Sequence, residues 1–244
     1  VTSIGSYAFY NCSGITEINI PETITAISSY TFYGCTKLQT ITIPSDSNIT
    51  SIGNSAFENT VAYENLTIGL SVVSLGTSAF KGSTNLVRLR LPRTMHNQIS
   101  QDAFENCENL VSVSLPDTLE ELGRYAFSYC SSLKEVTIPK NISYAVYAFR
   151  NCKSLERVIF AEGTTIVDDD MFSNCGSLKT VVLPDTIKTI GSSAFEYCYE
   201  LSDINIRDPY VLLHEGKYYL YGTRGPSCWG EGTGFDVYVS EDLE

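Results

Sequence analysis

The chain has 244 residues, of which 43% are hydrophobic, and its 28 acidic and 16 basic side chains give a formal net charge of −12 at pH 7. This composition excludes intrinsic disorder and collagen. The acidic balance argues against binding to nucleic acid or anionic lipid, because phosphate contacts need clustered Lys and Arg.

No stretch approaches the roughly 18 apolar residues of a membrane-spanning helix, so no transmembrane segment is predicted. The first residues lack the basic and apolar segments of a signal peptide. We therefore expect a globular or solenoid unit that was cut from a longer chain, with proteins or sugars as its partners.

A repeat of about 23 residues runs through most of the chain and has to be recognised before other signals are interpreted. The unit at residues 119–139 reads LEELGRYAFSYCSSLKEVTIP, and its neighbours keep the pattern I-x-x-I-G-x-x-A-F-x-x-C-x-x-L-x-x-I-x-I-P over residues 1–206. The phenylalanine of the pattern recurs at nine positions: Phe9, Phe32, Phe57, Phe80, Phe104, Phe127, Phe149, Phe172 and Phe195. The spacing predicts nine coils.

Each unit should contain one short strand followed by a corner. Apolar and polar residues alternate in L-x-x-I-x-I, the period of a strand with one buried face, so Val136 and Ile138 should point inward. Proline directly after the strand has no N–H for the ladder and ends it. A second apolar pair, such as Leu119 and Leu122, should form the opposite wall, and Gly123 should permit the bend into the Ala-Phe segment, where we expect short turns or 3₁₀ pieces.

A single coil buries too few apolar side chains to offset the backbone entropy of ordering it. Stacked coils share a core and a ladder of hydrogen bonds, as in solenoid proteins. This ninefold motif resembles the BspA-like family of bacterial surface leucine-rich repeats. The resemblance implies a right-handed solenoid built from an α/β repeat that is mostly β, and a non-catalytic, adhesion-type module without cofactors, located outside the cell or on the bacterial surface.

Seven cysteines share one repeat position, three residues after the phenylalanine: Cys12, Cys35, Cys107, Cys130, Cys152, Cys175 and Cys198. A disulfide framework or a metal site is one interpretation, but metal motifs bring cysteines together as C-x-x-C pairs. Thr60 and Ser83 occupy the position in the other two coils, and neither can form a disulfide. We expect reduced thiols at a small buried position that makes a local hydrogen bond, and no metal site.

The side chains between the inward-facing ones should form a broad polar surface. Arg88, Arg90 and Arg93, with Lys81 nearby in sequence, form a basic cluster in the fourth coil of an otherwise acidic chain. This cluster is a candidate contact for a protein or carbohydrate ligand, and ordinary surface variation is the alternative. Coils three and four also depart from the pattern, so we expect the stack to bulge there.

Ile159 and Val182 should place apolar side chains on the same, otherwise polar face, which makes them a second candidate contact. The acidic run at residues 168–170 offers no spaced loop of calcium ligands and is interpreted as a solvated turn. His96 is isolated, and no Ser/His/Asp or Cys/His set recurs in register. We expect no enzymatic activity from the solenoid.

After Ile206 the pattern ends, and the composition shifts to Tyr, Gly and the single Trp. Residues 210–221 predict a hairpin that turns at residues 215–216, and residues 234–240 predict a third strand. We expect residues 207–244 to be a separate β-rich unit that caps the apolar end of the solenoid.

These tail segments also resemble the first propeller blade of glycoside hydrolase family 43, and the resemblance implies that Asp208 matches the family's general base. Inverting hydrolysis needs a second carboxyl group about 6.5–9.5 Å away. No candidate for it follows Asp208 in a second blade, so Asp208 has no partner and we expect no hydrolase activity. The alternative function is the targeting region of a larger carbohydrate-active enzyme truncated within its first blade.

Overall fold

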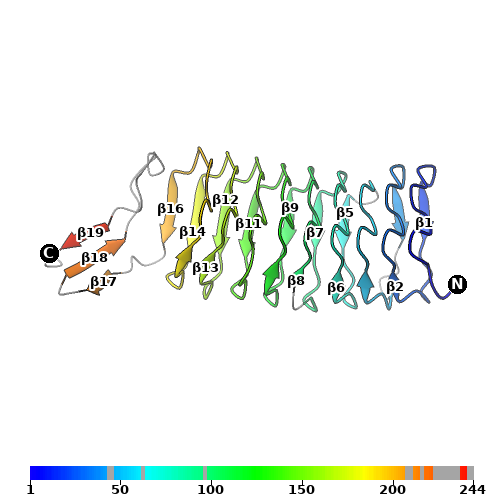
Figure 1. Cartoon of the computed structure of the whole chain (residues 1–244), viewed down its shortest axis with the longest axis horizontal. Coiled ribbons are helices and arrows are strands. Elements are labelled where there is room, and N and C mark those ends of the chain that lie inside the picture. The colour runs from blue at the N-terminus through cyan, green and yellow to red at the C-terminus, as the bar shows by residue number, and fades with distance from the viewer. Residues whose placement is uncertain are drawn as a thin grey trace.

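The structure, a computed structural model, describes residues 1–42, 47–61, 64–95 and 98–206, together with the strands at 211–214, 217–221 and 237–240. In the solenoid region the chain winds into a column of stacked coils, with the N-terminus at one end (Figure 1). The described residues form strands and turns and contain no helix. The repeat is therefore all-β, and the expected α/β mixture is corrected on this point.

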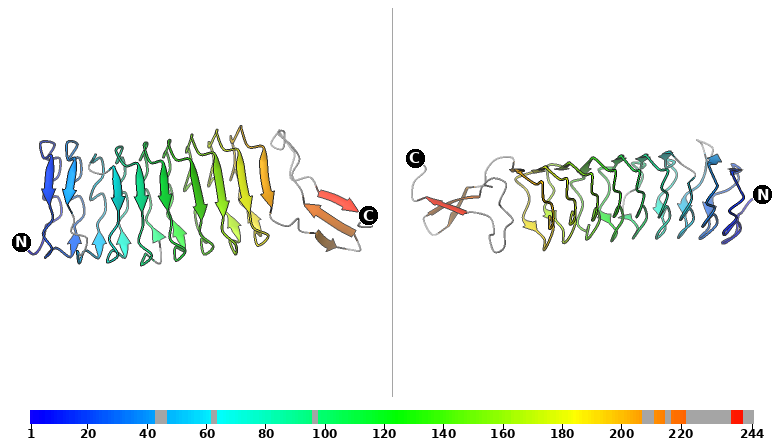
Figure 2. Two further views of the ribbon diagram at one scale, coloured as in Figure 1. Left: turned by 180° about the vertical axis from the view of Figure 1, so that it is seen from behind. Right: turned by 90° about the horizontal axis from the view of Figure 1, so that it is seen from above.

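One wall of the column carries a strand from each coil, and these strands are parallel. Two of them, β1 (Glu17–Asn19) and β3 (Thr40–Thr42), pair with each other. The next seven form one sheet in the order β5 (Asn65–Thr67), β7 (Arg88–Arg90), β9 (Ser112–Ser114), β11 (Glu135–Ile138), β12 (Arg157–Phe160), β14 (Thr180–Leu183) and β16 (Asp203–Ile206). Figure 2 shows these strands side by side along the column.

A second wall is built from two-residue strands, which also pair in parallel: β2 (Ala26–Ile27), β4 (Ser51–Ile52), β6 (Ser74–Leu75), β8 (Gln98–Ile99), β10 (Glu121–Leu122), β13 (Ile166–Val167) and β15 (Thr189–Ile190). An isolated bridge between Glu121 and Tyr144 continues this wall into the seventh coil. Leu119 and Leu122, which the repeat predicted to form this wall, have no exposed surface.

The Ala-Phe segments form a third wall and consist of turns in every coil. Backbone hydrogen bonds join each segment to the next coil, as where Phe104 N donates to the Ala126 oxygen at 2.9 Å. Two residues per coil adopt positive φ, at the second position before and after the phenylalanine, for example Tyr125 (59°) and Tyr129 (60°). Asn or Gly fills the later position in seven coils, which is the signal that predicts left-handed backbone.

The core is organised around a stack of phenylalanine rings. From Phe9 to Phe195, each ring lies parallel to the next, with centroids 5.1–5.7 Å apart and interplanar angles of 1–13°. Nine rings stack in the described part of the solenoid, which confirms the nine coils predicted from the phenylalanine spacing.

The cysteine position lies beside this stack. Its Sγ atoms donate hydrogen bonds to the phenylalanine carbonyl of the preceding coil, at 3.0–3.4 Å, in Cys35, Cys107, Cys130, Cys152, Cys175 and Cys198. All six are buried, and they are free thiols. Ser83 donates to the Phe57 oxygen in the same way, at 3.4 Å. The prediction of a small buried group with a local hydrogen bond is confirmed.

In the tail, β17 (Val211–His214) and β18 (Lys217–Tyr221) pair in antiparallel register, with His214 opposite Lys217. The strand β19 (Val237–Ser240) pairs with β18, also antiparallel. The predicted hairpin and third strand are therefore present. The predicted turn at 215–216 and Asp208 lie outside the described residues, and the capping role stays a prediction.

Candidate interaction surface

The parallel register aligns the outward side chains of the main sheet in two rows. Arg88 lies opposite Asn65 on one side and Ser112 on the other, while Arg90 lies between Thr67 and Ser114. Both arginines are exposed. Because alternate residues of a strand share a face, the two guanidinium groups project from β7 on the same side.

The neighbours of these arginines leave their charge uncompensated. All four residues opposite them are uncharged, and Arg88 Nη1 donates to Asn65 Oδ1, at 3.4 Å. Within the described parts of the chain, neither arginine belongs to an ion pair.

Arg157 lies in the same row as Arg88, two strands beyond β9, but its charge has a partner. Arg157 on β12 lies opposite Glu135 on β11, and its Nη1 atom is 3.4 Å from Glu135 Oε2. The sheet face therefore contains one arginine with a carboxylate partner, and the pair on β7 without one. Arg157 provides a matched control for any role assigned to Arg88 or Arg90.

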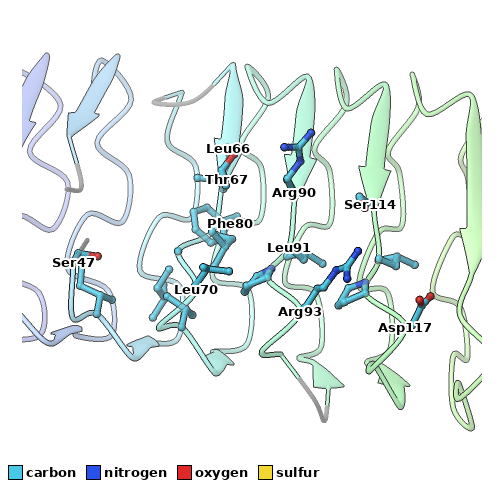
Figure 3. A pocket seen from close by; sticks show the side chains of 18 residues that line it. Ser47, Leu66, Thr67, Leu70, Phe80, Arg90, Leu91, Arg93, Ser114 and Asp117 are labelled. Atoms are coloured by element: carbon cyan, nitrogen blue, oxygen red, sulfur yellow. The ribbon is translucent and has the colours of Figure 1, made fainter. Parts of the chain in front are cut away.

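A pocket of about 920 Å³ opens beside Arg90, where the strands of coils three to five end (Figure 3). Arg93, in the turn after β7, lines the same pocket, and so does Asp117 from the next coil. The apolar part of the lining includes Leu66, Leu70, Leu91, Pro92 and Leu115. The three arginines predicted as contacts thus lie together, with two of them at a pocket whose lining is part apolar and part polar.

The pocket lies at the irregular coils. Gly69 replaces the proline of the repeat, and the following Leu70 is 73% exposed although it lines the pocket. The irregular pattern of coils three and four led to the prediction of a bulge, but a pocket was not predicted. The usable signal was an apolar residue, Leu70, at a turn position where other coils have polar residues such as Asp117.

A smaller hollow of about 400 Å³ lies between β9 and β11. These strands share one register pair, Glu135 with Ser112, whereas β7 and β9 share three. Val113 and Leu115, which lie beyond the single register pair of β9 and β11, are half-buried. Ser114 and Leu115 line both this hollow and the larger pocket, so the two are adjacent on the sheet face.

Lys81 does not join the arginines. It lies on the Ala-Phe wall, next to Phe80, and its ammonium group forms an ion pair with Glu105. The basic cluster therefore consists of Arg88, Arg90 and Arg93.

The second predicted contact is less exposed than expected. Ile159 and Val182 are register partners on β12 and β14, as predicted, and both face outward. However, Val182 lies between Ile159 and Asn205 in the register and keeps 8% of its surface exposed, while Ile159 is half-buried. The expectation of an exposed apolar pair is wrong for Val182, and whether either residue binds a ligand stays a prediction.

The acidic run has a structural role that the sequence did not predict. Asp168 Oδ2 accepts a hydrogen bond from Ala145 N at 2.8 Å, and Asp169 Oδ1 accepts one from Ser192 N at 2.7 Å. These carboxylates therefore connect neighbouring coils in addition to facing solvent. No group of side chains suited to a metal ion occurs in the described residues.

The stacked parallel coils, with one strand per repeat and a continuous apolar core, define a leucine-rich repeat solenoid. Residues 2–134 and 97–219 match the family model described as BspA type leucine rich repeat region, which has six copies, so the chain belongs to this family. No match was found among curated proteins.

Two solved structures are similar to this chain. The T. pallidum leucine-rich repeat protein TpLRR is 25% identical, with 82% of each chain covered and a TM-score of 0.61. A leucine-rich cell surface protein from Faecalibacterium prausnitzii A2-165 is 26% identical, with a TM-score of 0.53, and the similarity covers 85% of this chain and 64% of that one.

The glycoside hydrolase resemblance of residues 207–244 is not supported by these comparisons, and the repeat model extends into this segment, as far as residue 219. In the described residues, no helix has the length and apolar character needed to cross a membrane. The family match and the two solved relatives support an assignment of the chain as a repeat interaction module.

Proposed function

We propose that this chain is a non-catalytic, adhesion-type module, located outside the cell or on a bacterial surface, that binds a partner protein through the sheet face around Arg88 and Arg90. The observation that carries the proposal is the pair of arginines on β7, which have uncharged neighbours in register on a chain of net charge −12. A partner with an acidic surface supplies the missing carboxylates.

Salt screening explains how an acidic chain binds an acidic partner. At physiological ionic strength the Debye length is about 8 Å, so exposed charges farther away than this contribute little. The local field at the contact then comes from Arg88, Arg90 and Arg93, which outnumber the nearby carboxylate of Asp117 among the described residues. A guanidinium also forms two parallel hydrogen bonds with one carboxylate, which adds specificity to the attraction.

The chemistry of the surface supports binding rather than catalysis. It combines guanidinium groups with hydroxyl groups, apolar side chains and the carboxylate of Asp117. These groups can bind a ligand through charge, hydrogen bonds and apolar contact. The relative from F. prausnitzii is a cell surface protein, which supports the proposed location.

The test uses an array of immobilised extracellular proteins and glycans, probed with the wild-type chain, with the triple variant Arg88→Ala/Arg90→Ala/Arg93→Ala, and with Arg157→Ala. We expect a protein partner whose affinity falls at least tenfold in the triple variant and changes less than twofold in Arg157→Ala, with weaker binding at high salt. If the triple substitution leaves the affinity unchanged, the assignment of binding to this surface is wrong. The absence of any ligand overturns the module function in favour of a structural spacer, and exclusive binding of glycans overturns the choice of a protein partner.

A further inference from the structure

We infer that the pocket beside Arg90 and Arg93 receives an apolar side chain from an acidic peptide segment of the partner. This inference rests on the proposed function and deepens it, because it specifies where the partner anchors and which residue type it inserts.

The pocket is large enough for a buried anchor. Its volume of about 920 Å³ falls within the range of roughly 300–1,000 Å³ that is common for ligand sites. Leu66, Leu91 and Leu115 supply apolar walls, and the lining extends to the ring of Phe80 in the core. An apolar group is the ligand that gains most from such a lining, because it leaves water while the walls lose none of their hydrogen bonds.

The charges at the rim of the pocket favour a ligand that has a carboxylate next to its apolar group. Among the described residues that line the pocket, Arg90 and Arg93 carry two positive charges and Asp117 carries the one carboxylate. Neither arginine is in an ion pair within the described residues. A ligand with carboxylates next to its apolar group pairs with these guanidinium groups, whereas a basic ligand is repelled by them.

The continuity of the two hollows favours an extended peptide over a compact small molecule. Ser114 and Leu115 border both the larger pocket and the hollow between β9 and β11. Two strand spacings, on the order of 10 Å, separate β7 from β11. A peptide that crosses the strands can insert one side chain into the pocket and lay a second over the half-buried Val113.

The experiment measures binding of three fluorescently labelled 12-residue peptides by fluorescence anisotropy. The first contains Glu and Ser around a central Leu, the second has Ala in place of the Leu, and the third has Lys in place of every Glu. We expect the Glu/Leu peptide to bind at least tenfold more tightly than the Glu/Ala peptide. The Lys peptide should bind at least tenfold more weakly than the Glu/Leu peptide.

Two variants change the pocket at exposed lining positions and leave the core residues unchanged. Thr67→Trp places a ring at an exposed lining position, and Leu70→Asp adds a carboxylate at an exposed one. Each should reduce the Leu-over-Ala preference to less than threefold. Asn19→Trp, on the exposed face of β1 and away from the pocket, should leave the preference unchanged.

The outcomes separate this inference from the proposed function. Equal binding of the Glu/Leu and Glu/Ala peptides, with both weakened by Arg88→Ala/Arg90→Ala, overturns the pocket inference and leaves the arginine surface intact. A Leu preference that survives Thr67→Trp and Leu70→Asp also overturns the pocket inference. If all three peptides bind equally, the acidic partner itself is wrong and both proposals fail.

Discussion

The Sγ atom of Cys130 donates a hydrogen bond to the carbonyl oxygen of Phe104 in the preceding coil, across 3.4 Å. The Phe104 oxygen also accepts a backbone hydrogen bond from Cys107 N, at 3.3 Å. The phenylalanine carbonyl thus uses both of its lone pairs, one within its own coil and one toward the next. This contact requires a small side chain with a donor at the cysteine position, and Ser83 satisfies it with an oxygen.

Cys130→Ser should therefore fold with nearly wild-type stability, losing about 1 kcal/mol or less, because the hydroxyl can donate to the same oxygen. Cys130→Leu should destabilise the chain by roughly 1–3 kcal/mol or more, since a larger side chain overpacks a site with no exposed surface. Urea denaturation of both variants measures the difference. Similar losses for Ser and Leu would contradict the requirement for size and donor.

The buried thiols should make stability fall at alkaline pH. Burial raises the pKa of Cys107 to about 12 and raises the pKa of Cys130 well above its ordinary value of 9.0. In the unfolded chain these thiols ionise near 9, so between about pH 9 and 12 the unfolded state binds fewer protons than the folded state. The stabilisation is present below pH 9 and is lost as the pH rises.

Urea midpoints measured under reducing conditions at pH 7.5 and pH 10.5 test this dependence. The wild-type midpoint should be lower at pH 10.5, and the decrease should be smaller in Cys107→Ser, because the serine hydroxyl does not titrate in this range. An identical decrease in the two proteins would show that other groups cause the alkaline loss.

Sequence periodicity predicts the fold because each repeat position has one physical requirement. The inward direction of Val136 and Ile138 follows from alternation, and the number of coils follows from the phenylalanine spacing. The packing of Val182 does not follow, because its exposure depends on Ile159 and Asn205 in neighbouring coils.

The candidate surface was only partly predictable, for the same reason. The arginine cluster is visible in the sequence, and the register confirms that Arg88 and Arg90 share a face. The pocket is not visible, since it arises from the fit between coils with different turns. The separation of Lys81 from the arginines likewise depends on which wall each residue occupies, and the repeat pattern did not assign that wall.

Tyr129 occupies a left-handed backbone position that suits Asn or Gly better. Its φ is 60°, and the equivalent residue in the preceding coil is Asn106, with φ of 59°. The Tyr129 side chain is 45% exposed, so its removal costs little packing. Tyr129→Asn should stabilise the chain by about 0.5–1 kcal/mol, because Asn tolerates this conformation at a lower cost.

Thermal denaturation of Tyr129→Asn should give a higher Tm than the wild type, and Tyr129→Val should give a lower one, since a β-branched residue is strained at positive φ. Equal Tm values for Asn and Val would show that backbone conformation does not limit stability at this position.

Gly123 allows the sixth coil to approach the fifth. A Cβ atom on Gly123 would lie 2.5 Å from Gln101 N, whereas a Cβ on Gly5, the equivalent residue of the first coil, would meet nothing within 4 Å. Gly123→Ala should destabilise the chain by roughly 1–3 kcal/mol, because the two coils must move apart. Gly5→Ala is the matched control and should change the unfolding free energy by less than about 0.5 kcal/mol. Equal effects at the two positions would refute the close approach as the cause.

The loss of unfolding free energy should depend on salt for Arg157→Ala but not for Arg88→Ala, although both side chains contribute little to stability. The Arg157 and Glu135 side chains are each 51% exposed, so their ion pair should contribute no more than about 1 kcal/mol. Arg157→Ala should cost up to that amount at low salt, and the cost should shrink at 0.5 M NaCl, because screening weakens the pair in the wild type. Arg88→Ala has no carboxylate partner to lose and should be neutral within about 0.5 kcal/mol at either salt concentration. Urea denaturation of the two variants at low and high salt measures the contrast, and a salt-dependent loss in Arg88→Ala would mean that Arg88 is paired within the chain and is not available to a partner.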